Sequence, residues 1–185
     1  PSPGWTLGAK RILVVQVDFA DDPGGPRDGS VVVTRNAAAS VMGNVAQFFV
    51  DNSQNQTTIQ SAVLPAVLRL PGLKTDYANS TPDALRADAL SAAQAYDQAN
   101  GNTGVYNPAN YDFDIINFGP ITGGAWQFTG LSVIGGKGMW INGRFDLRTV
   151  AHELGHNYGL QHANRLDPAG TDPTVGTPEI GRAHV

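Results

Sequence analysis

Apolar residues along the chain form a few separate runs, and each run has the period of a strand or of a helix. Arg11–Phe19 is rich in β-branched residues and lies between glycine-containing turns, which predicts a buried strand. Asn36–Val50 has apolar residues at helical spacing and predicts an amphipathic helix. Thr57–Leu70 predicts two strands or one bent strand, because Pro65 cannot donate a hydrogen bond to a strand ladder. The N-terminal part of the chain therefore alternates strand and helix.

Further along the chain, a second helix signal precedes two further strand signals. The segment Thr81–Asp83 reads Thr-Pro-Asp and predicts a capped helix start, with the helix running to about Tyr96. Asp112–Phe118 predicts a strand, and a glycine-rich segment then leads to Met139–Asn142, which predicts a short edge strand. This alternation is typical of α/β and α+β domains, and we expect the α+β class.

Composition and charge narrow the classes of function. The 185 residues suffice for one domain, and with 41% hydrophobic and 15% charged residues the chain is apolar enough to fold. The net charge of −4 predicts no basic surface for nucleic acid, and no apolar run approaches the roughly 20 residues of a membrane span. Cysteine is absent, which excludes thiolate catalysis and cysteine-ligated metal in this chain. Histidines are then the main candidates for metal ligands.

The segment after the predicted strand Met139–Asn142 predicts another helix. Asp146 is a plausible N-cap, and Phe145 before it can pack on Val150 as a hydrophobic staple. An apolar stripe that faces a core is formed by Leu147, Val150, Ala151 and Leu154.

Three of the four histidines lie within eleven residues, at the spacing His-Glu-x-x-His-x-x-Gly-x-x-His. His152 and His156 are four residues apart and project from the same face of a predicted helix. Glu153 follows the first ligand, where its carboxylate can reach a metal-bound water without binding the metal. Gly159 can end the helix in a left-handed conformation, so that His162 approaches from another direction. Three nitrogen ligands and an open fourth position are the coordination of a catalytic zinc ion.

The segment His152–His162 resembles the zinc signature of the metzincin metallopeptidases. The wider stretch Tyr111–Asn164 resembles their gametolysin-like (reprolysin-like) branch. The resemblance implies an α+β fold with a zincin-like N-terminal subdomain, in which a twisted mixed sheet is packed against a backing helix and an active-site helix. It also implies that the strand at Met139–Asn142 is the antiparallel edge that binds an extended peptide substrate, and that the protein is secreted or at the cell surface.

The reaction implied by this resemblance is peptide-bond hydrolysis with one zinc ion on His152, His156 and His162. The ion would lower the pKa of its bound water from 15.7 towards about 7, and Glu153 would act first as general base and then as general acid. Two alternatives stay open: a zinc-binding but catalytically inactive adhesion or binding module, and an interaction domain in which the motif is accidental. Zinc content and chelator-sensitive hydrolysis distinguish these three hypotheses.

The C-terminal part of the chain departs from the family pattern. Metzincins have a methionine-containing turn downstream of the third histidine, whereas both methionines here, Met42 and Met139, lie upstream of it. We therefore expect residues 1–178 to be a partial catalytic domain without its C-terminal subdomain. The last seven residues, Glu179–Val185, match the translation of a common sequencing-library adapter. For this reason, and because a fourth ligand would close the open position, His184 is rejected as a metal ligand.

Several other residues have both a functional and a structural interpretation. Asp18, Asp21 and Asp22 could hold calcium through their carboxylates, but a solvated turn is favoured because the spacing of an EF-hand is absent. Tyr158 lies two residues beyond His156 and is favoured as a core residue rather than a catalytic one. Three aromatic residues could line a substrate cleft but are favoured for the core: Trp126, Phe128 and Trp140.

Overall fold

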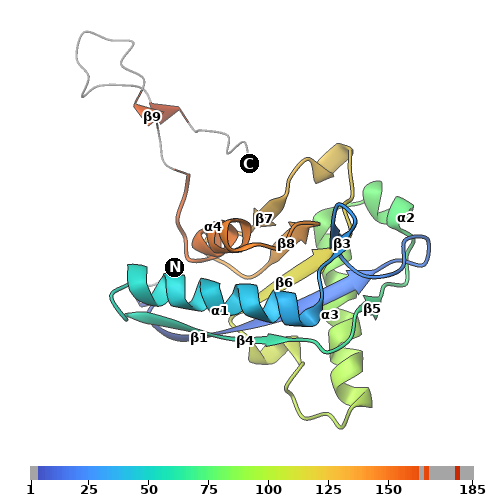
Figure 1. Cartoon of the computed structure of the whole chain (residues 1–185), viewed down its shortest axis with the longest axis horizontal. Coiled ribbons are helices and arrows are strands. Elements are labelled where there is room, and N and C mark those ends of the chain that lie inside the picture. The colour runs from blue at the N-terminus through green and yellow to red at the C-terminus, as the bar shows by residue number, and fades with distance from the viewer. Residues whose placement is uncertain (1–3, 163–164, 167–177, 180–185) are drawn as a thin grey trace.

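The computed structural model describes residues 4–162, 165–166 and 178–179, and in them a mixed β-sheet lies between two layers of helices (Figure 1). Four neighbouring strands run parallel and the last, β7, runs antiparallel to them. Across the sheet the order is β4 (Thr57–Val63), β1 (Gly8–Asp18), β6 (Phe113–Phe118), β8 (Met139–Asn142) and β7 (Gly130–Ser132), with β5 (Leu68–Arg69) paired to the far end of β1. The predicted α+β class with a mixed sheet is confirmed.

The central strand β1 is buried on both of its faces. Successive side chains of a strand point to opposite faces, so Ile12 and Val14 pack in one core cluster while Leu13 and Val15 pack in the other. A strand covered on both faces is a continuous apolar run in the sequence. The buried strand predicted at Arg11–Phe19 is therefore confirmed.

Helices cover the two faces of the sheet. α1 (Arg35–Asn52) and α4 (Leu147–Asn157) pack side by side on one face, as Figure 1 shows. α2 (Lys74–Ala78) and α3 (Pro82–Ala99) contribute to the core cluster on the other face. The hydroxyl of Thr81 accepts a hydrogen bond from the backbone N–H of Ala84, which confirms the predicted start of α3.

One strand prediction is wrong. Met139–Asn142 is not an edge strand, because β8 pairs in parallel with β6 and antiparallel with β7. The antiparallel edge of the sheet is β7, in which Gly130 lies opposite Ile141 and Ser132 opposite Met139. Its three residues, Gly-Leu-Ser, are too short and too weakly apolar to produce a strand pattern in the sequence.

The hydrophobic pattern does not predict most of the shorter elements. A segment of two to five residues offers few positions on which a helical or strand period can be recognised, and within residues 4–162 no helix or strand is predicted for six of them. They are α2, β2 (Arg27–Asp28), β3 (Val31–Val32), the 3₁₀-helices η1 (Pro108–Asn110) and η2 (Gly124–Trp126), and β7. By contrast, the two strands predicted within Thr57–Leu70 are confirmed as β4 and β5, which lie on either side of Pro65.

Beyond residue 162 the structure describes two strands, β9 (Arg165–Leu166) and β10 (Pro178–Glu179), which pair antiparallel with each other. In the family pattern, residues 163–178 lead towards a methionine turn. Apart from the residues of these two strands, this segment lies outside the described residues, and so do residues 180–185 with His184. Among the helices in the described ranges, none has the length and apolar character needed to cross a membrane.

Candidate metal centre

The helix that carries the first two histidines begins and ends at defined contacts. Asp146 accepts a hydrogen bond from the backbone N–H of Thr149 over 2.8 Å and is therefore the N-cap of α4, as predicted. Burial alone would raise the pKa of Asp146, but the hydrogen bonds from Thr149 and the charge of Arg144 outweigh it and lower that pKa. Gly159 follows the helix with φ of 96°, a left-handed conformation that glycine adopts without strain, so the predicted helix end is confirmed.

One face of α4 anchors the helix in the core. Val150 and Leu154 are fully buried with Phe145 in the cluster shared with α1, as the predicted apolar stripe and hydrophobic staple require. The prediction that Leu147 faces the core is wrong, because this residue is 38% exposed. Leu147 lies in the first turn of the helix and lines a cavity there instead of facing the core.

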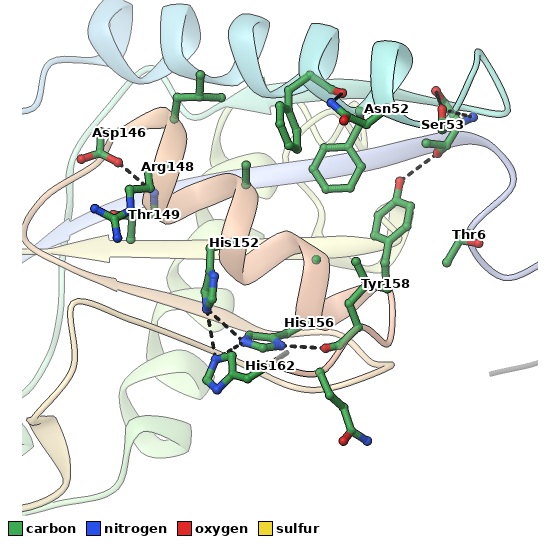
Figure 2. Close-up of a pocket in the computed structure, with 18 of the residues that line it drawn as sticks. Thr6, Asn52, Ser53, Asp146, Arg148, Thr149, His152, His156, Tyr158 and His162 are labelled. Carbon is green, nitrogen blue, oxygen red and sulfur yellow. Dashed lines mark hydrogen bonds between the residues drawn. The ribbon is translucent and has the colours of Figure 1, made fainter. Parts of the chain in front are cut away.

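The three predicted ligands come together at one point, as Figure 2 shows. The Nε2 atoms of His152 and His156 lie 3.2 Å apart, those of His152 and His162 lie 3.2 Å apart, and those of His156 and His162 lie 3.0 Å apart. A tetrahedral zinc ion with Zn–N bonds of about 2.0–2.1 Å holds its nitrogen ligands about 3.3–3.4 Å apart. Among the described residues, only this group of three has ligand atoms close enough to share a metal ion.

The carbonyl group of Leu160 fixes the tautomer of His156. Nδ1 of His156 lies 2.7 Å from this oxygen, which can only accept a hydrogen bond. Nδ1 therefore carries the proton, and Nε2 directs its lone pair towards the other two histidines. Metal-binding histidines typically make such a contact through their second ring nitrogen, which orients the ring and increases its basicity.

The three nitrogens cannot satisfy one another by hydrogen bonding. Each Nε2 either carries a proton or carries a lone pair, so at least two of the three are of the same kind. At 3.0–3.2 Å such a pair is repulsive, whichever tautomers the rings adopt. A cation accepted by three lone pairs removes this repulsion, so the donor set fits a zinc ion.

The surroundings of His152 favour a neutral imidazole, which is the form that binds metal. Burial lowers the pKa of His152, and the carboxylate of Glu153 opposes this effect. The nearby rings of His156 and His162 and the guanidinium of Arg148 lower the pKa further. The net shift is downward, so the lone pair of His152 is available near neutral pH.

The side chain of Glu153 extends from α4 to the edge strand β7. The residue is only 6% exposed, yet it lines a cavity together with the three histidines. The hydroxyl of Ser132 donates a hydrogen bond to its Oε2 atom over 2.7 Å. Within residues 4–162, no donor is hydrogen-bonded to Oε1. The carboxylate therefore has one oxygen held by Ser132 and one without a donor in this part of the chain, and the residue borders the same cavity as the three histidines.

Two cavities share the three histidines in their lining. The larger, of about 1650 Å³, lies between α1 and α4 and includes Phe48 and Leu147. The other, of about 1220 Å³, lies along β7 and includes Glu153, Leu131 and Ile134. Because only the second cavity contains the carboxylate, it is the better candidate for the place where a reaction occurs.

The aromatic residues with two interpretations serve mainly the fold. Tyr158 is buried, stacks on Phe113 with ring centroids 5.4 Å apart and shares a hydrogen bond with Thr57, so its predicted core role is confirmed. Trp126 and Trp140 are also buried, and their indole N–H groups donate to backbone carbonyls. Phe128 packs against the same core, and with Trp126 it also borders the cavity along β7.

The aspartates considered for calcium are held by donors of the protein itself. Asp18 pairs with Arg69 over 2.5 Å, and Asp22 pairs with Lys74 over 2.7 Å and also with Arg27. A side-chain oxygen of Asp21 accepts a hydrogen bond from the backbone N–H of residue 74 over 2.7 Å. The predicted solvated turn is therefore an ion-paired one.

Three further contributors to the site were not predicted. Gly130 and Ser132 contact Glu153 from β7, and Leu160 orients His156 from the turn after α4. No motif in the sequence marks them, because each reaches the site through the fold or through a backbone atom.

Comparison with known proteins gives no assignment. No protein-family model matches the sequence, and a search of curated proteins found no significant match. The function of the protein is therefore inferred from its motif and from the geometry described above.

Proposed function

We propose that the protein is a zinc-dependent endopeptidase of the metzincin type, with one zinc ion held by His152, His156 and His162. The observation that carries this proposal is the convergence of three Nε2 atoms within 3.0–3.2 Å of one another beside a buried carboxylate. When bound, the ion polarises the scissile carbonyl group and lowers the pKa of a water molecule. A mixed sheet with α1 as backing helix and α4 as active-site helix supports the assignment.

Glu153 moves the proton in this proposal. Its Oε1 atom takes a proton from the attacking water and delivers it to the nitrogen of the leaving amine. Two features support the role: Glu153 directly follows a metal ligand in α4, and its carboxylate borders the cavity that also contains all three histidines. A site that only bound zinc would have no need of a base at this position.

The proposed substrate is an extended peptide that adds to the sheet beside β7. Among the described strands, β7 pairs only with β8, so its outer side presents backbone N–H and C=O groups. Leu131 and Ile134 are exposed in the cavity along this strand and would contact apolar side chains of the peptide. The net charge of −4 favours peptide over nucleic acid as the partner, and the family resemblance favours a secreted or cell-surface location.

The test is hydrolysis of an internally quenched peptide library by the zinc-loaded protein, with and without a chelator. We expect hydrolysis that the chelator abolishes and that Glu153→Gln abolishes without loss of zinc. Asp51→Asn, on the exposed end of α1, is the matched control and should retain full activity. A folded protein with one zinc ion and no hydrolysis would instead indicate the binding-module alternative, and absence of zinc binding would indicate an accidental motif.

A further inference from the structure

We infer that the edge strand β7 positions the carboxylate of Glu153, with Gly130 providing the space for it and Ser132 holding one of its oxygens. The inference rests on the proposed function, since it concerns the group proposed to carry the proton. β7 and α4 are separate elements packed against each other, so the device is formed by the tertiary structure.

Ser132 controls the orientation of the carboxylate. Its hydroxyl donates to Oε2 of Glu153 over 2.7 Å, and hydrogen bonds to a charged acceptor are stronger than those between neutral groups. The last torsion of a glutamate side chain is soft, so a carboxylate without such a partner would sample a wide range of orientations. With Oε2 held by Ser132, Oε1 is the oxygen to which the proposed function assigns the proton transfer.

Gly130 is required for space. A Cβ atom at this position would lie 2.6 Å from both Cγ and Oε1 of Glu153 and 2.8 Å from Cδ. Non-bonded carbon atoms do not approach so closely, so any side chain here would displace Glu153. The φ angle of Gly130 is not in the left-handed region, so the need for glycine comes from the close approach of Glu153 alone.

The register of the sheet explains why these two residues act together. Gly130 and Ser132 are two residues apart and share one face of β7, the face towards α4. On β8 the residues opposite them are Ile141 and Met139, both fully buried in the cluster that includes α4. The edge strand thus has a glycine and a serine where the next strand has two large side chains, and Glu153 occupies the space.

Further contacts hold β7 and α4 at a fixed separation. The side-chain amide of Asn157, at the end of α4, donates to the carbonyls of Val133, Gly136 and Gly138, which follow β7. The backbone N–H of Gly135 donates to the carbonyl of the second histidine over 2.8 Å. Because the proposed substrate also pairs with β7, one strand would place both the peptide and the proton carrier. Gly130 and Ser132 act through Glu153 and are positioning residues.

The first experiment compares Ser132→Thr with Ser132→Val, which have the same shape and differ only in the hydroxyl group. We expect Ser132→Thr to keep the wild-type kcat and Ser132→Val to lose roughly 10- to 100-fold in kcat, the size of a hydrogen bond to a charged group. KM and zinc stoichiometry should be unchanged in both, which a general structural defect would not produce. Equal kcat values for the two variants would overturn the inference.

A second variant tests the space requirement. Gly130→Ala should lower kcat more than Ser132→Val does, because the new methyl group displaces the carboxylate instead of merely releasing it. Gly43→Ala is the matched control: a Cβ there meets nothing within 4 Å, and alanine is favoured in a helix. A Gly130→Ala protein with wild-type kcat would contradict the role of Gly130.

A measurement on the zinc-free protein separates this inference from the proposed function. The urea midpoints of Ser132→Thr and Ser132→Val are compared with Glu153 present and again in a Glu153→Ala background, as a double-mutant cycle. We expect Ser132→Thr to be the more stable only when Glu153 is present. A difference that is the same in both backgrounds overturns the positioning of Glu153 by β7. Coupling in the cycle, together with a zinc-loaded protein that hydrolyses no peptide, supports the positioning and refutes the proposed function.

Discussion

Two polar clusters of this protein differ in how their groups are satisfied. Near the end of β1, the carboxylates of Asp18 and Asp22 are matched by the side chains of Arg69 and Lys74 and by backbone N–H groups. On α4, three imidazole nitrogens face one another, and no arrangement of their protons satisfies all three contacts. The first cluster is complete within the protein and serves the fold. The second has a donor set that fits a cation, and we propose that it binds one, which would make it a binding site rather than a structural network.

The largest expected effect comes from removing one nitrogen of the second cluster. His156→Ala should lower zinc affinity by more than the roughly 10- to 100-fold that loss of an outer-shell partner costs, because it removes a ligand itself. Competition with a chromophoric chelator measures the affinity. Gln161→Ala, an exposed neighbour of the third histidine, is the control and should bind zinc as the wild type does. Wild-type affinity in His156→Ala would remove the distinction between the two clusters.

Glu153 differs from the carboxylates of the first cluster, because among its described contacts it has a serine partner and no ion pair. Glu153→Gln should retain one zinc ion and lose roughly 10²- to 10⁴-fold in kcat, the usual contribution of a general acid–base. Metal analysis and initial rates on the same preparation give both quantities. A Glu153→Gln protein with the wild-type rate would show that the proton is carried by another group.

Removing an ion pair that serves the fold should lower the stability of the protein and leave zinc binding intact, which is the opposite of the effect expected for His156→Ala. Arg86 and Asp114 share two hydrogen bonds of 2.6 Å, and their side chains are 23% and 4% exposed. Arg86→Met leaves the aspartate buried without its cation and should lower the free energy of unfolding by about 2–4 kcal/mol, less than a fully buried pair would cost. Urea denaturation measures this change.

The control for that variant is Arg144→Met. The side chain of Arg144 is 62% exposed and pairs with Asp146, so this substitution should cost less than about 1 kcal/mol. If the two arginine variants had equal stability, the burial of the pair at Asp114 would not matter to the fold.

The smallest expected effect is a pH dependence in the first cluster. Burial raises the pKa of Asp18, but the hydrogen bond and charge of Arg69 and the backbone N–H groups of Gly24 and Gly25 outweigh it, so the pKa lies below its ordinary value. Ionised Asp18 therefore stabilises the fold above about pH 4, and this contribution disappears as the pH falls through the lowered pKa. The urea midpoints of wild type and Asp18→Asn should differ at pH 7 and converge below pH 4. A constant difference across this range would contradict the assignment.

The sequence predicts the long elements of the fold well and the short ones poorly. β1, α1 and α3 extend over enough residues for their hydrophobic period to be read, and local capping by Thr81 and Asp146 marks two helix starts. β7 has only three residues, and the pairing that makes it the edge depends on residues seven to eleven positions away. For this reason the sequence predicts the edge at Met139–Asn142, which the structure places one strand inside the edge.

The same division applies to the candidate site. The spacing of His152 and His156 on one helical face follows from local geometry, and Gly159 explains the approach of His162. Ser132 and Gly130 meet Glu153 only because β7 packs against α4. A contact between distant elements leaves no pattern in the local sequence. The three histidines could therefore be predicted as candidate ligands, whereas the residues that contact the carboxylate could not.

The most direct test of the central claim is the rate of peptide hydrolysis as a function of added zinc, starting from the metal-free protein. We expect the rate to rise in proportion to zinc up to one equivalent per chain, to stay constant beyond it, and to return to zero when a chelator is added. A rate that does not depend on zinc, or a protein that binds one equivalent and hydrolyses nothing, would contradict the claim.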